Sequence, residues 1–189
     1  VYGSGDPVLL LHGGLGHSDV WGNQIPAIAA KHKVIAVDSR GHGRSTRNEA
    51  PYSYDLMADD VLALMDHLKI DKASIVGWSD GAIIGLSLAM SHPDRVSRLF
   101  AFAANSDPSG VKDVTKRPVF TAFIARAEKE YQALSATPTE YKKFVDEIST
   151  MWMTQPHWSA TDLGAIKVHS WIVDADHDEA IERPDTEFM

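Results

Sequence analysis

The chain has 189 residues, of which 44% are hydrophobic and 23% are charged, and its formal net charge is −8. This length predicts one domain that can bury a sizeable core, and the acidic balance argues against nucleic acid or an anionic membrane as a partner. The absence of cysteine excludes a disulfide framework, a thiolate nucleophile and a cysteine-ligated metal site.

No apolar run approaches the roughly 20 residues that a membrane span needs, and no signal segment is visible. We therefore expect a cytoplasmic protein. The nine histidines are scattered, without the spacing that places two of them on one helix face for a metal, so no metal or cofactor is expected. No oligomeric state follows from the sequence.

Short apolar runs alternate with helical patterns over residues 1–104. The predicted strands are Val8–Leu11, Lys33–Val37, Lys72–Val76 and Arg98–Ala104. Residues 21–30 have moderate helical character, Ser53 is predicted to cap a helix that runs to Leu68, and a further helix is predicted to end near Ser91. Such alternation is typical of an α/β fold, with a mostly parallel sheet covered by helices on both faces.

Residues 105–158 contain no predicted strand and read as a helical insertion. Pro118 begins one helix, and a capping box over Thr137–Glu140 is predicted to open a second. Most of the aromatic side chains here are expected to form the insertion's own core, and two or three are expected to contact substrate. Ser159–Asp162 is predicted to cap a short turn, and residues 168–173 are predicted to form a strand. The expected domain organisation is therefore a first part of the core at 1–104, the helical insertion at 105–158 and a second part of the core at 159–189.

A sharp turn is predicted at Gly77-Trp78-Ser79-Asp80-Gly81, between an apolar strand and a helix of small and apolar residues. Glycines two residues before and after a serine are typical of a nucleophile elbow, which forces the serine into strained backbone angles with its hydroxyl exposed. A glycine-rich turn that contains a serine by chance is the alternative, and the surrounding pattern favours the elbow.

Glycine also follows the first predicted strand, in His12-Gly13-Gly14. Such a pair lets the backbone turn and leaves amide N–H groups free to face a ligand, although a plain glycine turn has the same pattern. The loop of residues 38–45 is dense in glycine and charge, and we expect Asp38 and His42 to satisfy its own backbone groups in preference to catalysis.

Acidic side chains follow the last predicted strand. They are Asp174, Asp176, Asp178 and Glu179, with His177 among them. A carboxylate at the end of a parallel strand is well placed to orient a catalytic histidine, so an acid partner for Ser79 is available here. A solvated acidic loop is the alternative.

Four motifs, at residues 10–14, 37–45, 77–81 and 174–178, together resemble the α/β-hydrolase family in their order and separation. The resemblance covers nearly the whole chain. It implies Ser79 as the nucleophile, the amides of Gly14 and Asp80 as the oxyanion hole, with Leu15 a less favoured alternative, and the insertion as a cap domain. Serine at position 79 disfavours the haloalkane dehalogenase and epoxide hydrolase branches, which use an aspartate nucleophile.

For the acid, the family usually shows a glycine, two residues and then the aspartate. Ala175 stands at that glycine position, which points to Asp178 ahead of Asp176. The family's catalytic histidine follows the acid after a further helix and strand, and no histidine lies beyond His177. We therefore expect a chain truncated at both ends, without an N-terminal hairpin and without a C-terminal helix, strand and histidine, that by itself retains only residual catalysis.

The resemblance implies a serine hydrolase that cleaves a carboxylic ester, or a related acyl substrate, through an acyl-enzyme. Trp78, Asp80 and Trp152 are the expected substrate-binding residues of a small or medium apolar substrate. The elbow also resembles that of valacyclovir hydrolase-like members, in which a carboxylate beside the nucleophile would attract an ammonium group; alternatively, Asp80 serves only the first helical turn. A non-catalytic scaffold on the same fold, or a cofactor-free perhydrolase or lyase, stays open.

Overall fold

Five strands form one parallel sheet in the computed structural model, which describes residues 1–189. The strands are β1 (Pro7–Leu11), β2 (Lys33–Val37), β3 (Ala73–Trp78), β4 (Val96–Phe102) and β5 (His169–Val173). Their order is β2-β1-β3-β4-β5, and every neighbouring pair is parallel. The α/β fold class expected from the alternating pattern is confirmed.

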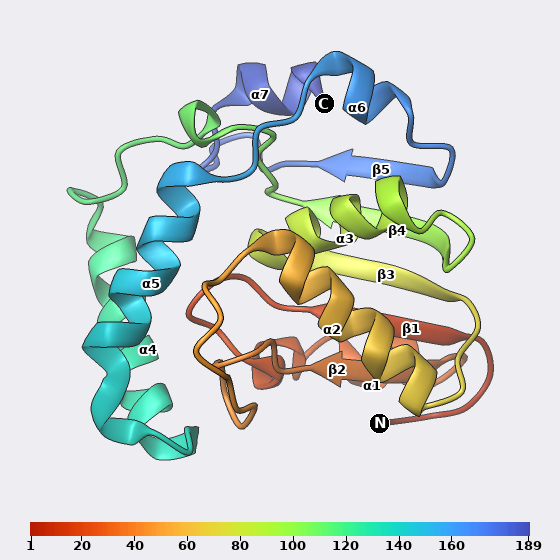
Figure 1. Ribbon diagram of the computed structural model, residues 1–189, viewed down its shortest axis with the longest axis horizontal. Coiled ribbons are helices and arrows are strands. Elements are labelled where there is room, and N and C mark those ends of the chain that lie inside the picture. The colour runs from red at the N-terminus through yellow and green to blue at the C-terminus, as the bar shows by residue number, and fades with distance from the viewer.

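Six helices lie between strands along the chain, and a seventh, α7, follows β5 (Figure 1). They are α1 (Ile25–Ala29), α2 (Tyr54–His67), α3 (Asp80–Ser91), α4 (Pro118–Leu134), α5 (Tyr141–Thr154), α6 (Ala160–Gly164) and α7 (Arg183–Phe188). Short 3-10 turns cover Ser18–Trp21, Pro108–Gly110 and Pro138–Glu140. No helix combines the length and the apolar character needed to cross a bilayer.

Alternate side chains of β1 enter two separate apolar clusters. Leu9 and Leu11 pack with α2 and α3 in the main core, whereas Val8 and Leu10 pack on the other face against the region of α1. This burial on both faces is why the strands read as continuous apolar runs. The second face is covered only beside β1 and β2, and Trp171 on the edge strand β5 is 61% exposed.

Helices α4 and α5 lie side by side beyond the edge of the sheet where the strands end (Figure 1). They pack through aromatic rings, and Tyr131 stacks on the fully buried Phe144 with ring centroids 5.0 Å apart. The capping box predicted at Thr137 is wrong: its hydroxyl hydrogen-bonds that of Tyr131 at 2.9 Å, and a 3-10 turn precedes α5. Ser159 does cap α6, with Asp162 completing a capping box.

The loop after β2 is held by its own polar side chains, as expected. Asp38 accepts hydrogen bonds from the backbone N–H of Ser18 at 2.6 Å and of Arg44 at 2.9 Å. The His12 ring accepts the Ser39 N–H at 3.0 Å, and the His42 ring pairs with the Arg40 carbonyl oxygen at 2.9 Å. Burial lowers the pKa of His12 from 6.5 to about 4 and that of His42 to about 3. Both rings are therefore neutral near pH 7 and serve to hydrogen-bond the backbone of this loop.

Helix α3 starts in unusually close contact with the sheet. A Cβ added at Gly77 would lie 2.3 Å from the Gly81 carbonyl oxygen, and one added at Gly81 would lie 2.1 Å from the Leu11 carbonyl oxygen. Both obstacles are backbone atoms, which cannot rotate away. Glycine at these two positions is therefore required by the approach of α3 to β1 and β3.

Substitution of Gly81 by alanine should destabilise the protein by about 3 kcal/mol or more, because its methyl group would push α3 off β1. The matched control is Gly164→Ala in α6, where a Cβ would meet nothing within 4 Å. That variant should be neutral or more stable by up to about 1 kcal/mol. Urea unfolding measures both, and equal midpoints for the two variants would contradict the close contact.

The buried histidines should make the fold sensitive to acid. Because the pKa of His42 is lower in the folded state than the ordinary 6.5, stability is lost as pH falls from about 6.5 towards about 3, by about 1.4 kcal/mol per pH unit. His42→Phe removes this proton-binding site and keeps a ring against Phe144. Its unfolding free energy should fall less steeply with acid than that of the wild type, and parallel pH profiles would contradict the prediction.

Candidate active site

Ser79 occupies the turn between β3 and α3 in a strained backbone conformation. Its φ is 53° and its ψ is −121°, a region that residues other than glycine rarely adopt. The Ser79 N–H donates to the Phe102 carbonyl oxygen at 2.8 Å, and the Ser79 carbonyl oxygen accepts the Ala82 N–H at 2.8 Å. Backbone bonds from β4 and from α3 thus hold the serine in this conformation, with its side chain at the end of the sheet.

A cavity of about 560 Å³ opens above Ser79, between the strand ends and α4. Its walls combine glycine backbone, aromatic rings and a few charged groups. The lining residues are Gly13, Gly14, Trp78, Ser79, Ala103, Val119, Phe120, Ala122, Phe123, Arg126, Trp152, Asp178, Glu179 and Ala180. The volume is in the range of small-molecule sites. Four sequence-predicted site residues besides Ser79 therefore meet at one cavity.

Three backbone N–H groups close to Ser79 are candidate donors to an anion. The N–H groups of Gly14 and Leu15 donate to no acceptor within the chain, and the Asp80 N–H belongs to the first residue of α3, where helices have no internal acceptor. Gly14 lines the cavity, whereas Leu15 is 5% exposed and does not. A side chain at Gly14 would collide with Trp152, at 2.4 Å from its Cζ2.

The Asp80 carboxylate is buried beneath this cavity. One oxygen accepts the Tyr54 hydroxyl at 3.1 Å, and the Trp152 indole N–H lies 2.9 Å from both oxygens. Burial raises the pKa of Asp80 to about 6, while the hydrogen bonds from Trp152 and Tyr54 oppose the rise. The side chain is 4% exposed and does not line the cavity, although sequence reasoning placed it against substrate.

Asp178 lies at the cavity on the loop after β5, and Asp176 does not. One oxygen of Asp178 accepts the backbone N–H groups of Ala180 and Ile181, both at 2.7 Å. Burial raises the pKa of Asp174, and the charge of neighbouring Asp178 adds to the rise. No histidine lines the cavity, and the structure has no group of three or more histidine, aspartate or glutamate side chains that could hold a metal ion.

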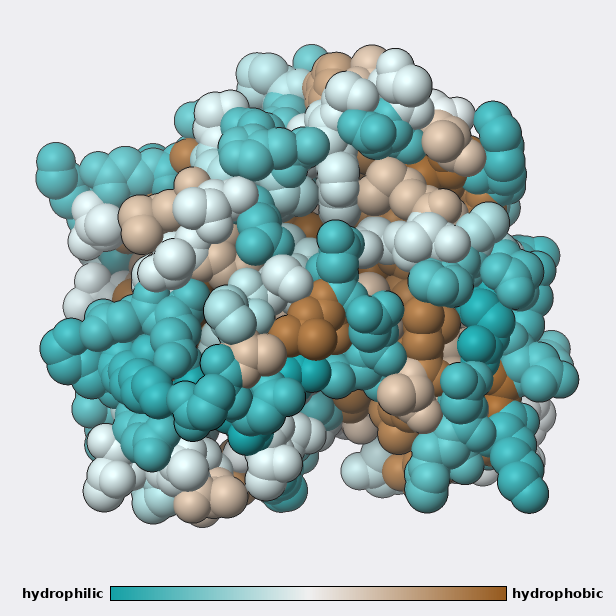
Figure 2. Space-filling model, viewed as in Figure 1, coloured by the Kyte–Doolittle hydropathy of each residue, from teal (hydrophilic) through white to brown (hydrophobic).

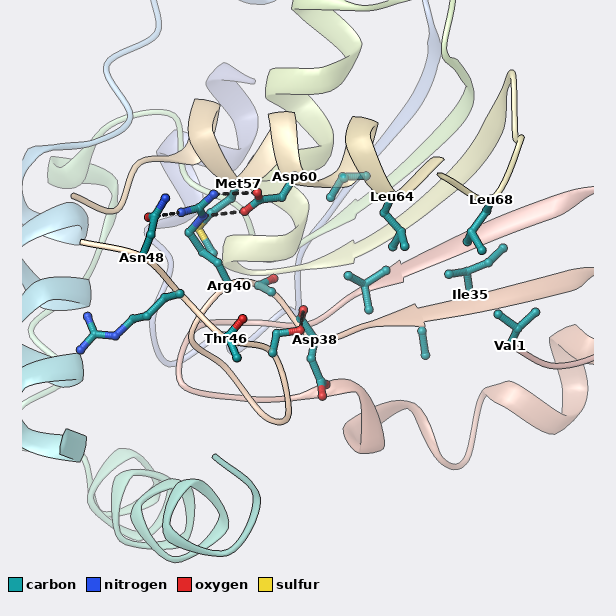
Figure 3. A pocket seen from close by; sticks show the side chains of 16 residues that line it. Val1, Ile35, Asp38, Arg40, Thr46, Asn48, Met57, Asp60, Leu64 and Leu68 are labelled. Atoms are coloured by element: carbon teal, nitrogen blue, oxygen red, sulfur yellow. Dashed lines mark hydrogen bonds and ion pairs between the residues drawn. The ribbon is translucent and has the colours of Figure 1, made fainter. Parts of the chain in front are cut away.

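A second cavity, of about 670 Å³, lies between β2 and α2 and has a different character (Figure 3). Arg40 donates to both oxygens of Asp60, at 2.5 and 2.6 Å, and to Asn48 at 3.0 Å. Leu64 and Leu68 line its other end, as the figure shows. Its main charged pair, Arg40 with Asp60, is already formed, and neither Ser79 nor Asp178 lines it.

Ion pairs connect α5 and the turn before it to the loop that precedes α2. Arg47, whose side chain is 12% exposed, pairs with Glu140 at 3.1 Å and with Glu147. Lys143 pairs with Glu49 at 3.6 Å. Figure 2, in the view of Figure 1, shows hydrophilic residues over this side of the molecule. Ion pairs outside and the Trp152–Asp80 contact inside therefore join α5 to the rest of the chain.

Sequence reasoning missed two residues of this region. Tyr54, which binds Asp80, is the first residue of α2 and carries no signal beyond following the Ser53 cap. Arg126 lines the cavity from α4, where its guanidinium lies 5.5 Å from the centre of the Phe123 ring. Helical periodicity could have found Arg126, because it lies three residues after Phe123 and thus on the same side of the helix.

Comparison with known proteins identifies the fold. A family model described as the alpha/beta hydrolase fold matches residues 6–140. The putative carbamate hydrolase RutD of Caulobacter segnis is 42% identical over 108 residues, which are 56% of this chain and 40% of that protein. The 3-oxoadipate enol-lactonase 2 of Acinetobacter baylyi is 38% identical over 100 residues, or 52% of this chain and 38% of that protein. The chain spans about two fifths of the length of these curated relatives.

The fold of solved structures superposes on almost the entire chain. Est816, described as an N-acyl homoserine lactone degrading enzyme, superposes with a TM-score of 0.81 at 23% identity, covering 99% of this chain and 81% of that one. The meta-cleavage product hydrolase CumD of Pseudomonas fluorescens IP01 gives 0.82 at 24% identity, with coverages of 99% and 78%. At these identities the likeness shows the fold alone. Since the family model matches well over half of the chain and the observed sheet agrees with it, the chain belongs to the alpha/beta hydrolase family.

Proposed function

We propose that the protein is a serine hydrolase that cleaves a carboxylic ester, or a related acyl substrate, through an acyl-enzyme intermediate. The observation that carries the proposal is the position of Ser79. It sits in a strained turn at the start of α3, on a cavity that Gly14 and Asp178 also line. The hydrolase names of curated relatives support the same reaction class.

In the proposed reaction, the Ser79 oxygen attacks the substrate carbonyl carbon, and the carbonyl oxygen becomes an oxyanion. The amides of Gly14 and Asp80 stabilise this oxyanion, because both N–H groups lack an acceptor and border the serine. The tetrahedral intermediate expels the alcohol, which takes the proton that Ser79 gave up. Water then attacks the acyl carbon, the bond to the Ser79 oxygen breaks, this oxygen takes back a proton from the water, and the acid is released.

The proton transfers need a general base at Ser79, and the family's usual base is a histidine oriented by an acid. Asp178 fits the role of the acid, because its backbone contacts engage one oxygen and it faces the cavity. None of the nine histidines lines the cavity. We therefore infer that these 189 residues by themselves hydrolyse esters at no more than a residual rate, supplied by the oxyanion hole and binding.

The walls of the cavity favour a small or medium apolar group on the substrate. Trp78 contributes a ring from the sheet, Phe120 and Phe123 contribute rings from α4, and Trp152 contributes one from α5. We propose that Trp78 and Trp152 contact the substrate, and that residues 105–158 act as a cap over the sheet. A small-molecule ester is accordingly the proposed partner.

Replacement of Ser79 by alanine should reduce hydrolysis of p-nitrophenyl esters by the full-length protein by about 10⁴-fold or more, because no nucleophile remains. Initial rates of p-nitrophenol release measure the loss. Ser97→Ala is the control, since Ser97 is an exposed serine whose hydroxyl meets only that of Ser74. Equal turnover by Ser79→Ala and Ser97→Ala would refute the proposal.

The choice between the two candidate acids can be tested by a matched pair of variants. Asp178→Asn keeps an oxygen for the Ala180 and Ile181 N–H groups but loses the charge that would orient the base, so kcat should fall by about 10⁴-fold. Asp176→Asn alters an exposed side chain away from the cavity and should retain activity. Steady-state kinetics decide, and the reverse ranking would move the acid to Asp176.

A further inference from the structure

The buried Asp80 carboxylate joins three helices at one point. Asp80 opens α3, its Tyr54 partner opens α2, and its Trp152 partner lies in the last turn of α5. The three contacts are 2.9 to 3.1 Å long. Hydrogen bonds to an ionised group are stronger than those between neutral groups, and the start of a helix of this length favours a negative charge. The carboxylate is therefore a strong anchor for the indole.

Asp80 and Trp152 face the cavity differently. Trp152 forms part of its wall, whereas the Asp80 side chain lies behind the wall. Both carboxylate oxygens are already engaged by the indole N–H. A substrate ammonium group would have to displace the indole before it could reach the carboxylate. Asp80 can thus act on the cavity through Trp152.

The indole of Trp152 also packs directly on Gly14. A Cβ at Gly14 would lie 2.4 Å from Cζ2 of the indole and 2.5 Å from an oxygen of Asp80. Because the Gly14 amide is a proposed oxyanion donor, the ring borders the place where the substrate carbonyl would bind. Any movement of the ring changes the room beside that amide.

We propose that Asp80 is a positioning residue, which fixes the indole of Trp152 over Gly14 and thereby limits the size of the substrate group accepted beside the oxyanion hole. The inference rests on the proposed function, since the wall selects nothing unless a substrate reacts at Ser79. Removal of the acceptor would leave the indole N–H buried without a partner, which favours rotation of the ring.

The test compares kcat/KM of the full-length protein for p-nitrophenyl octanoate and p-nitrophenyl acetate. Trp152→Phe and Asp80→Leu should each raise the octanoate-to-acetate ratio by about tenfold, the equivalent of one lost hydrogen bond to a charged group. The double variant should shift the ratio no further than either single variant, because both changes remove the same interaction. Asp80→Asn keeps one oxygen as an acceptor for the indole N–H, so its octanoate-to-acetate ratio should stay close to that of the wild type.

Tyr54→Phe is the matched control. It removes the other donor from the same carboxylate, and Tyr54 does not line the cavity, so the ratio should stay at the wild-type value even where stability falls. A second readout is independent of activity. In nitrogen-15 spectra, the Trp152 indole N–H, assigned by its absence in Trp152→Phe, should exchange slowly in the wild type and in Tyr54→Phe, and rapidly in Asp80→Leu.

The outcomes separate this inference from the function on which it rests. An unchanged ratio in Trp152→Phe, an equal shift in Tyr54→Phe, or slow indole exchange in Asp80→Leu would overturn the positioning role, while Ser79→Ala stays inactive. If Asp80→Leu selectively lost the hydrolysis of esters that carry an ammonium group, the positioning role would be overturned too, because the carboxylate would then contact substrate. Full activity of Ser79→Ala would overturn the proposed function and this inference with it.

Discussion

The contact between the first turn of α3 and strands β1 and β3 determines the geometry of the candidate site. Because Gly77 and Gly81 have no side chain, the helix backbone can approach the Leu11 carbonyl. This approach forces Ser79, which lies between the two glycines, to a φ of 53°. Such a conformation costs about 1–3 kcal/mol and persists only where packing determines it. Here α3 is buried almost throughout, from Asp80 to Ala89, so its packing offsets the cost.

From that contact, the electrostatic arrangement of the site follows. The start of α3, with its positive dipole end, lies next to Ser79 at the cavity, and the same turn buries the Asp80 side chain behind Trp152. Burial acts in opposite directions on the ionisable groups nearby, because it disfavours charge: it raises the pKa of Asp80 and lowers those of His12 and His42. Each of these groups is accommodated by specific hydrogen bonds.

The fold of this chain is well defined by its similarity to known structures, whereas its substrate is not. Its sheet superposes on hydrolases described for lactone and meta-cleavage substrates at below 25% identity, so one framework accommodates different reactions. The surfaces that line the cavity from α4 and α5 come from a segment between β4 and β5 that adds no strand to the sheet. Under the proposed function this segment supplies much of the wall that faces the substrate, and its Trp152 is hydrogen-bonded to the buried Asp80.

The sequence by itself determined the features that arise from neighbouring residues. Apolar runs such as Val8–Leu11 identify strands buried on both faces, and the glycines around Ser79 identify a turn that five consecutive residues produce. Local patterns fail where another side chain competes, as at Thr137, whose hydroxyl binds that of Tyr131 and caps no helix. β4 likewise begins at Val96, two residues before the predicted start, because pairing with β3 extends it.

Only the tertiary structure decided what surrounds the site. Tyr54 and Trp152 lie 26 and 72 residues from Asp80 along the chain, and no periodicity relates them. For Asp80 the sequence left open a contact with substrate or a role in the first helical turn alone, and the structure shows a buried acceptor of hydrogen bonds from Tyr54 and Trp152. The physical reason is that burial and hydrogen-bond partners depend on how α2, α3 and α5 pack, and packing brings together residues that the sequence keeps apart.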